Sequence, residues 1–193
     1  MTRILLIAGS ARQGALSVRL RDAARAELDA AGASTDVLDL RALAMPVCDG
    51  DIESNEGPPP GALALRDALR GADALLFVTP EYNGFPTPLA FNAFDWLSRV
   101  PAAGDAPRGM AVLADKPLAL LSASPGAAGG LRSLNLMRQF LGGTFGMLVL
   151  PQQLAVAQAN AAFDDAGALR DERQRQSLAD IARRLVALAQ RQR

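Results

Sequence analysis

The chain has 193 residues and half of them are apolar, which suits one compact α/β domain over residues 1–193. Twenty basic and twenty acidic residues cancel without any long run of like charge, so neither nucleic acid nor an anionic membrane is expected as a partner. The chain has no histidine and a single cysteine, Cys48, which excludes His-based triads, the usual zinc sites and disulfides within one chain. If the protein is an enzyme, we therefore expect a cofactor to carry the reaction.

Apolar runs rich in branched residues predict five strands, at residues 4–8, 35–40, 74–79, 118–122 and 146–151. Stretches with helical periodicity alternate with them, which predicts right-handed crossovers and a parallel sheet covered by helices on both faces. Residues 46–60 combine acids, glycines and prolines and are predicted to be a surface loop. The apolar run before Gly9 is too short for a signal peptide and no segment is long enough to span a membrane, so we expect a cytoplasmic protein.

Ligands of open parallel sheets bind beyond the carboxyl ends of the strands. The loop after the first predicted strand contains polar residues that could bind such a ligand. It reads "GSARQGALS", with Ser10, Arg12 and Ser17, and a helix is expected to begin near Ser17. A phosphate dianion could be bound here by the hydroxyl groups, the guanidinium and the N–H groups at the start of a helix. An ordinary strand-to-helix turn with a serine cap is an equally good interpretation of this loop alone.

The loops after the third and fourth predicted strands are also unusual. The first of them, "TPEYNGFP", places Tyr82 between a carboxylate and an amide, which suits a flat heteroaromatic ligand, although Tyr82 could instead pack on the surface of a turn. The other, "SASPGAAGG", contains Ser122, Ser124 and three glycines that let the backbone approach a ligand closely.

Four stretches taken together, "GSAR" (9–12), "PEYN" (80–83), "NAFDWLSR" (92–99) and "SPGAAGG" (124–130), resemble the NAD(P)H-dependent FMN reductase family, and within it the quinone and chromate reductase branch. The resemblance implies a flavodoxin-like, doubly wound five-stranded parallel sheet of order 2-1-3-4-5, with noncovalently bound FMN. It implies NAD(P)H as cosubstrate, a quinone-like acceptor or a flavin, azo compound or chromate, ping-pong kinetics, and a homodimer or homotetramer. The cofactor-binding residues that it implies are Ser10, Arg12, Ala15, Leu16, Ser17, Pro80, Glu81, Tyr82, Asn83 and Ser124. No catalytic side chain and no metal ligand are expected, because the flavin carries the hydride.

The chain departs from the family pattern at several positions. Ala15 and Ser17 stand where Ser and Asn are usual, while Phe85 and Phe91 replace a frequent Ser and Lys and make the expected flavin rim more apolar. Trp96 is expected to pack inside the subunit and not to touch substrate. Two alternatives remain: a flavodoxin-type electron carrier, against which the zero net charge argues, and a flavin-free binding module, which the changes at Ala15 and Ser17 favour. The preference between NADH and NADPH stays open.

Overall fold

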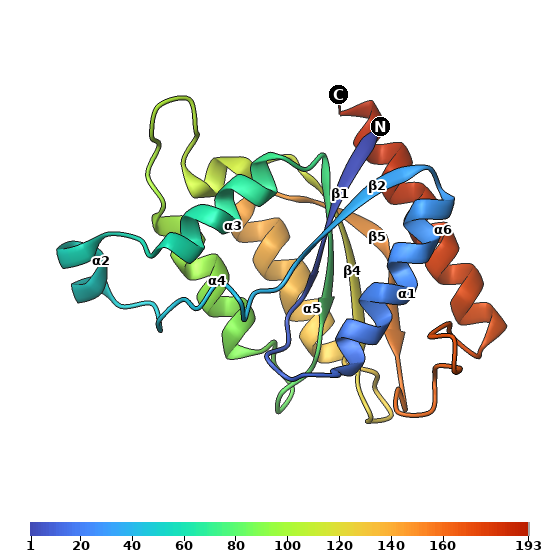
Figure 1. Cartoon of the computed structure of the whole chain (residues 1–193). Coiled ribbons are helices and arrows are strands. Elements are labelled where there is room, and N and C mark those ends of the chain that lie inside the picture. Colours follow the sequence, from blue (N-terminus) through green and yellow to red (C-terminus); the bar gives the residue numbers. More distant parts are fainter. Residues whose placement is uncertain (193) are drawn as a thin grey trace.

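The computed structural model describes residues 1–192 and is built on a five-stranded parallel sheet of order β2-β1-β3-β4-β5 (Figure 1). The strands are β1 (Thr2–Ala8), β2 (Ala33–Leu38), β3 (Ala74–Thr79), β4 (Pro117–Ala123) and β5 (Leu148–Val156). This order confirms the flavodoxin-like arrangement implied by the sequence. The bounds of β2 and β5 differ from the predicted 35–40 and 146–151, since these two strands lie at the sheet edges and only a minority of their residues are fully buried.

Helices cover both faces of the sheet (Figure 1). They are α1 (Leu16–Ala30), α2 (Gly50–Glu56), α3 (Pro60–Arg70), α4 (Pro88–Arg99), α5 (Leu131–Gln139) and α6 (Glu172–Arg191), with a 3-10 turn at Gly109–Val112 and a π turn at Phe140–Thr144. Alternate residues of β1 show the division: Ile4 and Leu6 pack with α1 and α6, whereas Leu5 and Ile7 pack with α3, α4 and α5. Among residues 1–192, no helix is both long and apolar enough to cross a membrane.

The segment 46–60, predicted to be a loop, contains the short helix α2 and the start of α3. Asp49 begins α2, and its side chain accepts a hydrogen bond of 2.7 Å from Asp51 N. No residue of α2 is buried, so the helix has no apolar face and its sequence carries no helical periodicity that would predict it.

Trp96 of α4 lies fully inside the protein, as expected, and its Nε1 donates a hydrogen bond of 2.7 Å to the Pro46 carbonyl. The neighbouring Asn92 accepts a bond of 2.6 Å from Cys48 N and donates one of 2.8 Å to the same carbonyl. These contacts attach residues 46–48 to α4.

The thiol of Cys48 is partly buried and burial raises its pKa, so it stays protonated at neutral pH.

Candidate functional site

The first candidate loop joins β1 to α1, which begins at Leu16 without a side-chain cap. Val18 N and Arg19 N donate the first bonds, to the carbonyl of Ala15, so the N–H groups of Leu16 and Ser17 precede the helical hydrogen bonds. Ser17 is therefore the second residue of the helix, and the predicted serine cap is wrong, although the loop is a strand-to-helix turn.

The side chain of Ser17 is 1% exposed, and its Oγ has no hydrogen-bond partner within residues 1–192. Leaving a buried hydroxyl unpaired costs about 1–3 kcal/mol, so such atoms call for an explanation. An acceptor brought by a ligand at the start of α1 would supply the missing bond.

Ser10 and Arg12 lie in the same loop as Ser17 but have different surroundings. Ser10 is largely buried, and its Oγ accepts a hydrogen bond of 3.2 Å from Arg12 N. The guanidinium of Arg12 is exposed and has no hydrogen bond or ion pair within the described residues. Arg12 is thus a positive charge that is not neutralised by a neighbour.

The second candidate loop is a tight hairpin, closed by two hydrogen bonds between Tyr82 and Phe85 of 2.8 and 3.0 Å. Its two central residues, Asn83 and Gly84, have φ values of 53° and 86°, as in the type I′ turn that Asn-Gly favours. The side chains of Tyr82 and Phe85 are 46% and 59% exposed. This turn therefore holds two aromatic rings at the carboxyl end of β3 in a fixed backbone.

Glu81 connects this hairpin to α5. One carboxylate oxygen accepts a side-on contact from the Arg132 guanidinium, with Nε at 3.0 Å, and the other accepts a bond of 3.3 Å from Ser133 N. The Glu81 side chain is only 8% exposed, and the hydrogen bonds from Arg132 lower its pKa, so it is ionised at neutral pH. The Glu81 carboxylate therefore bonds the hairpin to α5, whereas the resemblance implied that Glu81 binds the cofactor.

The third candidate loop connects β4 to α5, and two of its glycines are required by its own packing. Gly129 and Gly130 have φ values of 62° and 83°, and a Cβ on Gly129 would lie 2.8 Å from the backbone at the end of β5. Ser122 Oγ donates a bond of 2.8 Å to the Gly129 carbonyl, while Ser124 Oγ accepts one of 3.2 Å from Gly126 N. The loop is therefore folded back tightly on the sheet.

The three loops are also bonded to one another. Thr87, which caps α4, donates through its Oγ1 to the Gly9 carbonyl and so ties the second loop to the first. Ser133 is fully buried, and its Oγ donates a bond of 2.8 Å to the Pro80 carbonyl and contacts Thr79 Oγ1 at 2.7 Å. The sequence analysis did not identify Thr87, Arg132 and Ser133 as residues that hold these loops together. In the sequence they are only polar residues near the start of a predicted helix.

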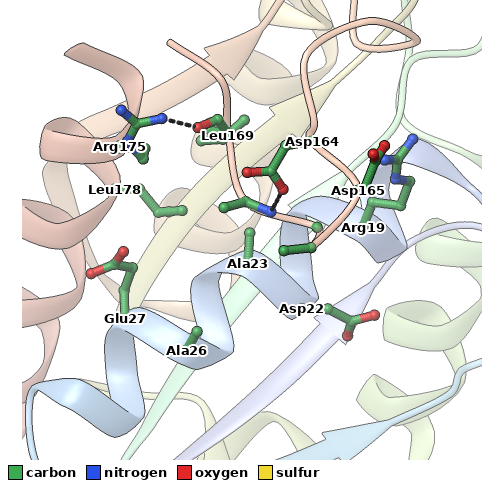
Figure 2. A pocket seen from close by; sticks show the side chains of 13 residues that line it. Arg19, Asp22, Ala23, Ala26, Glu27, Asp164, Asp165, Leu169, Arg175 and Leu178 are labelled. Carbon is green, nitrogen blue, oxygen red and sulfur yellow. Dashed lines mark hydrogen bonds between the residues drawn. The ribbon is translucent and has the colours of Figure 1, made fainter. Parts of the chain in front are cut away.

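Several cavities open on the molecule. One of about 630 Å³ lies between the first loop and the end of β2 and contains Ser10 and Arg12, but its lining excludes Ser17 and residues 80–83. Another, of about 480 Å³, lies between α1, α6 and residues 164–169, with Ala23 and Leu178 on its walls (Figure 2). That second cavity includes none of the predicted site residues. A third, of about 460 Å³, is largely apolar and lies between residues 45–48 and α4.

Residues 2–161 match the model of the family described as NADPH-dependent FMN reductase. The chain is 36% identical to a quinone reductase of Escherichia coli (strain K12) over 140 residues, which cover 72% of this chain and 69% of the relative. It is 34% identical over 175 residues to an NAD(P)H-dependent FMN reductase of Pseudomonas aeruginosa, covering 90% and 88% of the two chains. Among solved structures it resembles the flavoenzyme NAD(P)H:(acceptor) oxidoreductase FerB of Paracoccus denitrificans, with a TM-score of 0.80, 22% identity and coverage of 99% and 98%.

Proposed function

The chain belongs to the NADPH-dependent FMN reductase family, and on that premise we propose that its loops after β1, β3 and β4 bind FMN and that it reduces quinones. The protein is an oxidoreductase with FMN as cofactor and NAD(P)H as cosubstrate. A quinone-like molecule is the acceptor suggested by the names of its relatives.

The observation that carries the proposed site is the buried, unpartnered hydroxyl of Ser17. An FMN phosphate at the start of α1 would accept this bond, together with bonds from the N–H groups of Leu16 and Ser17. Ser10 would contribute a second hydroxyl and Arg12 a positive charge, while Ala15 would approach the phosphate through its backbone. The residues present in this loop therefore fit a phosphate monoester.

The isoalloxazine ring would lie between the hairpin at Tyr82–Phe85 and the glycine-rich loop that carries Ser124. Bound FMN would supply the two-electron redox chemistry of the site. Pro80 and Asn83 would offer backbone and amide groups to the polar edge of the ring, and Glu81 would keep the hairpin in position through Arg132. The apolar side chains at the rim would exclude water, and no protein side chain has to act as acid or base.

We propose that two copies of the chain associate, as a homodimer or within a homotetramer, through the surface formed by residues 45–48, the hairpin at Tyr82–Phe85 and α4. The exposed side chains of Val47, Tyr82 and Phe85 and the apolar cavity beside α4 support this proposal, since a second copy would cover them. Sedimentation of the purified protein would test this association.

Residues 1–193 are taken as a single FMN-binding domain, because α6 lies beyond the family match but packs into the same core. The cytoplasm is the proposed compartment.

The first experiment is the visible spectrum of the purified protein. We expect a yellow protein that releases FMN, and not FAD, on denaturation, because only one phosphate site is built into the first loop. A colourless protein that takes up no added FMN would overturn the proposed site.

The second experiment addresses the order of the two half-reactions. Because NAD(P)H and the quinone would occupy the same position against the ring in turn, initial rates should give parallel double-reciprocal lines. Intersecting lines would mean that both substrates bind together, and would contradict a shared position.

A further inference from the structure

The cavity of about 480 Å³ between α1, α6 and residues 164–169 shares no residue with the proposed FMN site, and we call it the α1–α6 cavity (Figure 2). Ala23 and Ala26 of α1 form one wall, and Leu178 of α6 lies on another. The short side chains of the two alanines leave space that larger residues would fill. A volume of this size is typical of cavities that bind small organic molecules.

The loop that closes the α1–α6 cavity is held in shape by its own hydrogen bonds. Asp164 Oδ1 accepts a bond of 2.8 Å from Ala168 N, and Asp164 N donates one of 2.9 Å to the Ala168 carbonyl. Arg175 of α6 donates through Nη1 to the carbonyls of Leu169 and Arg170, at 2.6 and 3.0 Å. The cavity is therefore formed before a ligand arrives, so binding does not have to order the loop.

The charged groups around the cavity do not balance. The lining contains the carboxylates of Asp22, Glu27, Asp164 and Asp165 and the guanidinium groups of Arg19 and Arg175. Arg21, which pairs with Asp22, and Glu172, which pairs with Arg175, lie outside the lining and cancel each other. The guanidinium of Arg19 lies over the Phe163 ring, 4.6 Å from its centre. An excess of two negative charges therefore remains around the cavity.

Glu27 is the lining carboxylate best placed to bind a cation. It is partly buried and forms no hydrogen bond or ion pair within residues 1–192. Figure 2 shows its carboxylate pointing from α1 toward Leu178 of α6, while the carboxylate of Asp164 comes from the loop on the other side of Ala23. A cation stabilises a carboxylate beside apolar side chains more than one in water, because the effective dielectric constant is lower there.

The walls of the cavity favour an organic cation over a metal ion. Within the described part of the chain, no three His, Cys, Asp or Glu side chains are arranged to hold a metal ion. The carboxylates of Glu27 and Asp164 are instead separated by the apolar surface of Ala23. A ligand that matches both features carries a positive charge and an apolar body.

We propose that the α1–α6 cavity is a binding site for a small organic amine, in which a primary ammonium group is attached to an apolar body. The ammonium group would contact Glu27 and Asp164, and its three N–H donors would satisfy carboxylate oxygens that lack a partner. The apolar body would lie against Ala23, Ala26 and Leu178. The inference does not depend on the proposed function, because none of these residues belongs to the proposed FMN site.

The test measures the binding of 2-phenylethylamine to the purified full chain in the presence of FMN, by isothermal titration calorimetry at low ionic strength. We expect one site per chain with a dissociation constant of about 1 mM or lower. Two analogues separate the contributions of charge and apolar body. 2-Phenylethanol keeps the ring without the charge, ethylamine keeps the charge without the ring, and each should bind at least about fivefold more weakly.

Two variants test the cavity itself. Glu27→Gln removes the charge at nearly constant size and should weaken 2-phenylethylamine about fivefold or more, while binding of 2-phenylethanol stays as in the parent. Ala23→Leu fills the space and should abolish the binding of both compounds. The matched controls are Glu56→Gln on α2 and Ala30→Leu at the end of α1, both exposed and outside the lining, which should keep the parent affinity.

Three results would each overturn the inference: no saturable binding to the parent, equal affinity for 2-phenylethylamine and 2-phenylethanol, or parent affinity in a folded Glu27→Gln or Ala23→Leu protein. Thermal melts show whether each variant is folded, and if one is not, the other decides. Binding of 2-phenylethylamine should persist without FMN. A chain that takes up no FMN would therefore contradict the proposed function and leave this inference intact.

Discussion

The unpartnered hydroxyl of Ser17 leads to a prediction with opposite signs for stability and for cofactor binding. In the FMN-free protein the hydroxyl is 1% exposed and has no partner within residues 1–192, so Ser17→Ala removes a buried polar group that costs about 1–3 kcal/mol. Alanine is also the better helix former. The apoprotein of Ser17→Ala should therefore be as stable as the parent or more stable, by up to about 1 kcal/mol once the lost packing of one oxygen is subtracted.

FMN binding should respond in the other direction. A hydrogen bond to a charged phosphate contributes about 1.5–3 kcal/mol, so its removal should raise the dissociation constant of FMN about 10- to 150-fold. Apoprotein titrated with FMN, with quenching of flavin fluorescence as the signal, measures this constant. Thermal melts of both apoproteins measure the change in stability.

Ser133→Ala is the matched control, because Ser133 is equally buried but fully bonded, to the Pro80 carbonyl and to Thr79. Its apoprotein should lose about 1 kcal/mol, since the hydrogen bonds of Ser133 Oγ are removed while Thr79 Oγ1 still donates to the Pro80 carbonyl at 2.9 Å. If Ser17→Ala destabilised the apoprotein as Ser133→Ala does and left the FMN affinity unchanged, the assignment of Ser17 to the phosphate would be refuted.

Three further predictions follow from the same loops. Arg12→Ala should weaken FMN binding by about 10- to 150-fold in the same titration while the apoprotein melts within about 0.5 kcal/mol of the parent, and an unchanged affinity would remove Arg12 from the phosphate site. Arg132 lowers the pKa of Glu81, so the contact stabilises the fold above the unfolded pKa of about 4.3 and is lost as the pH falls through the lowered folded value; Glu81→Gln should flatten the acid limb of a stability–pH curve, and an unaltered limb would argue against the brace. Gly129→Ala should cost about 1–3 kcal/mol in denaturant unfolding, because φ is 62° and the Cβ meets backbone, whereas Gly143→Ala, with open space around it, should cost far less.

The elements that the sequence predicted well are those whose burial leaves a clear pattern. β1, β3 and β4 are covered on both faces, so their residues are continuously apolar, and they lie close to the predicted ranges. Most residues of the edge strands β2 and β5 are only partly buried, and the predicted bounds of these strands were wrong by a few residues. The helix α2 has no fully buried residue, and its sequence shows no helical periodicity. An element could therefore be predicted from the sequence where it is well buried, whether it is a helix or a strand.

In the candidate site, local interactions could be predicted from the sequence and interactions between distant residues could not. The Asn83-Gly84 turn is encoded by adjacent residues, and the resemblance identified the loops that contain Ser10, Arg12 and Ser17. The bond from Arg132 to Glu81 joins residues 51 apart, and that from Thr87 to Gly9 joins residues 78 apart. No spacing in a single sequence predicts such pairs, because they depend on which loops the fold brings to the same edge.

These distant bonds explain why Ser17 is informative. Glu81, Thr87, Ser122 and Ser133 lie in or beside the three loops, are largely buried, and each satisfies its polar atoms with the protein itself. Loops fixed in this way are already ordered before a ligand arrives, so binding does not have to supply that ordering free energy. In a framework so completely bonded, a single buried hydroxyl without a partner is not explained by loose packing. It lies at the start of α1, where the N–H groups of Leu16 and Ser17 also precede the helical bonds, and an anion at that place would satisfy all three groups together.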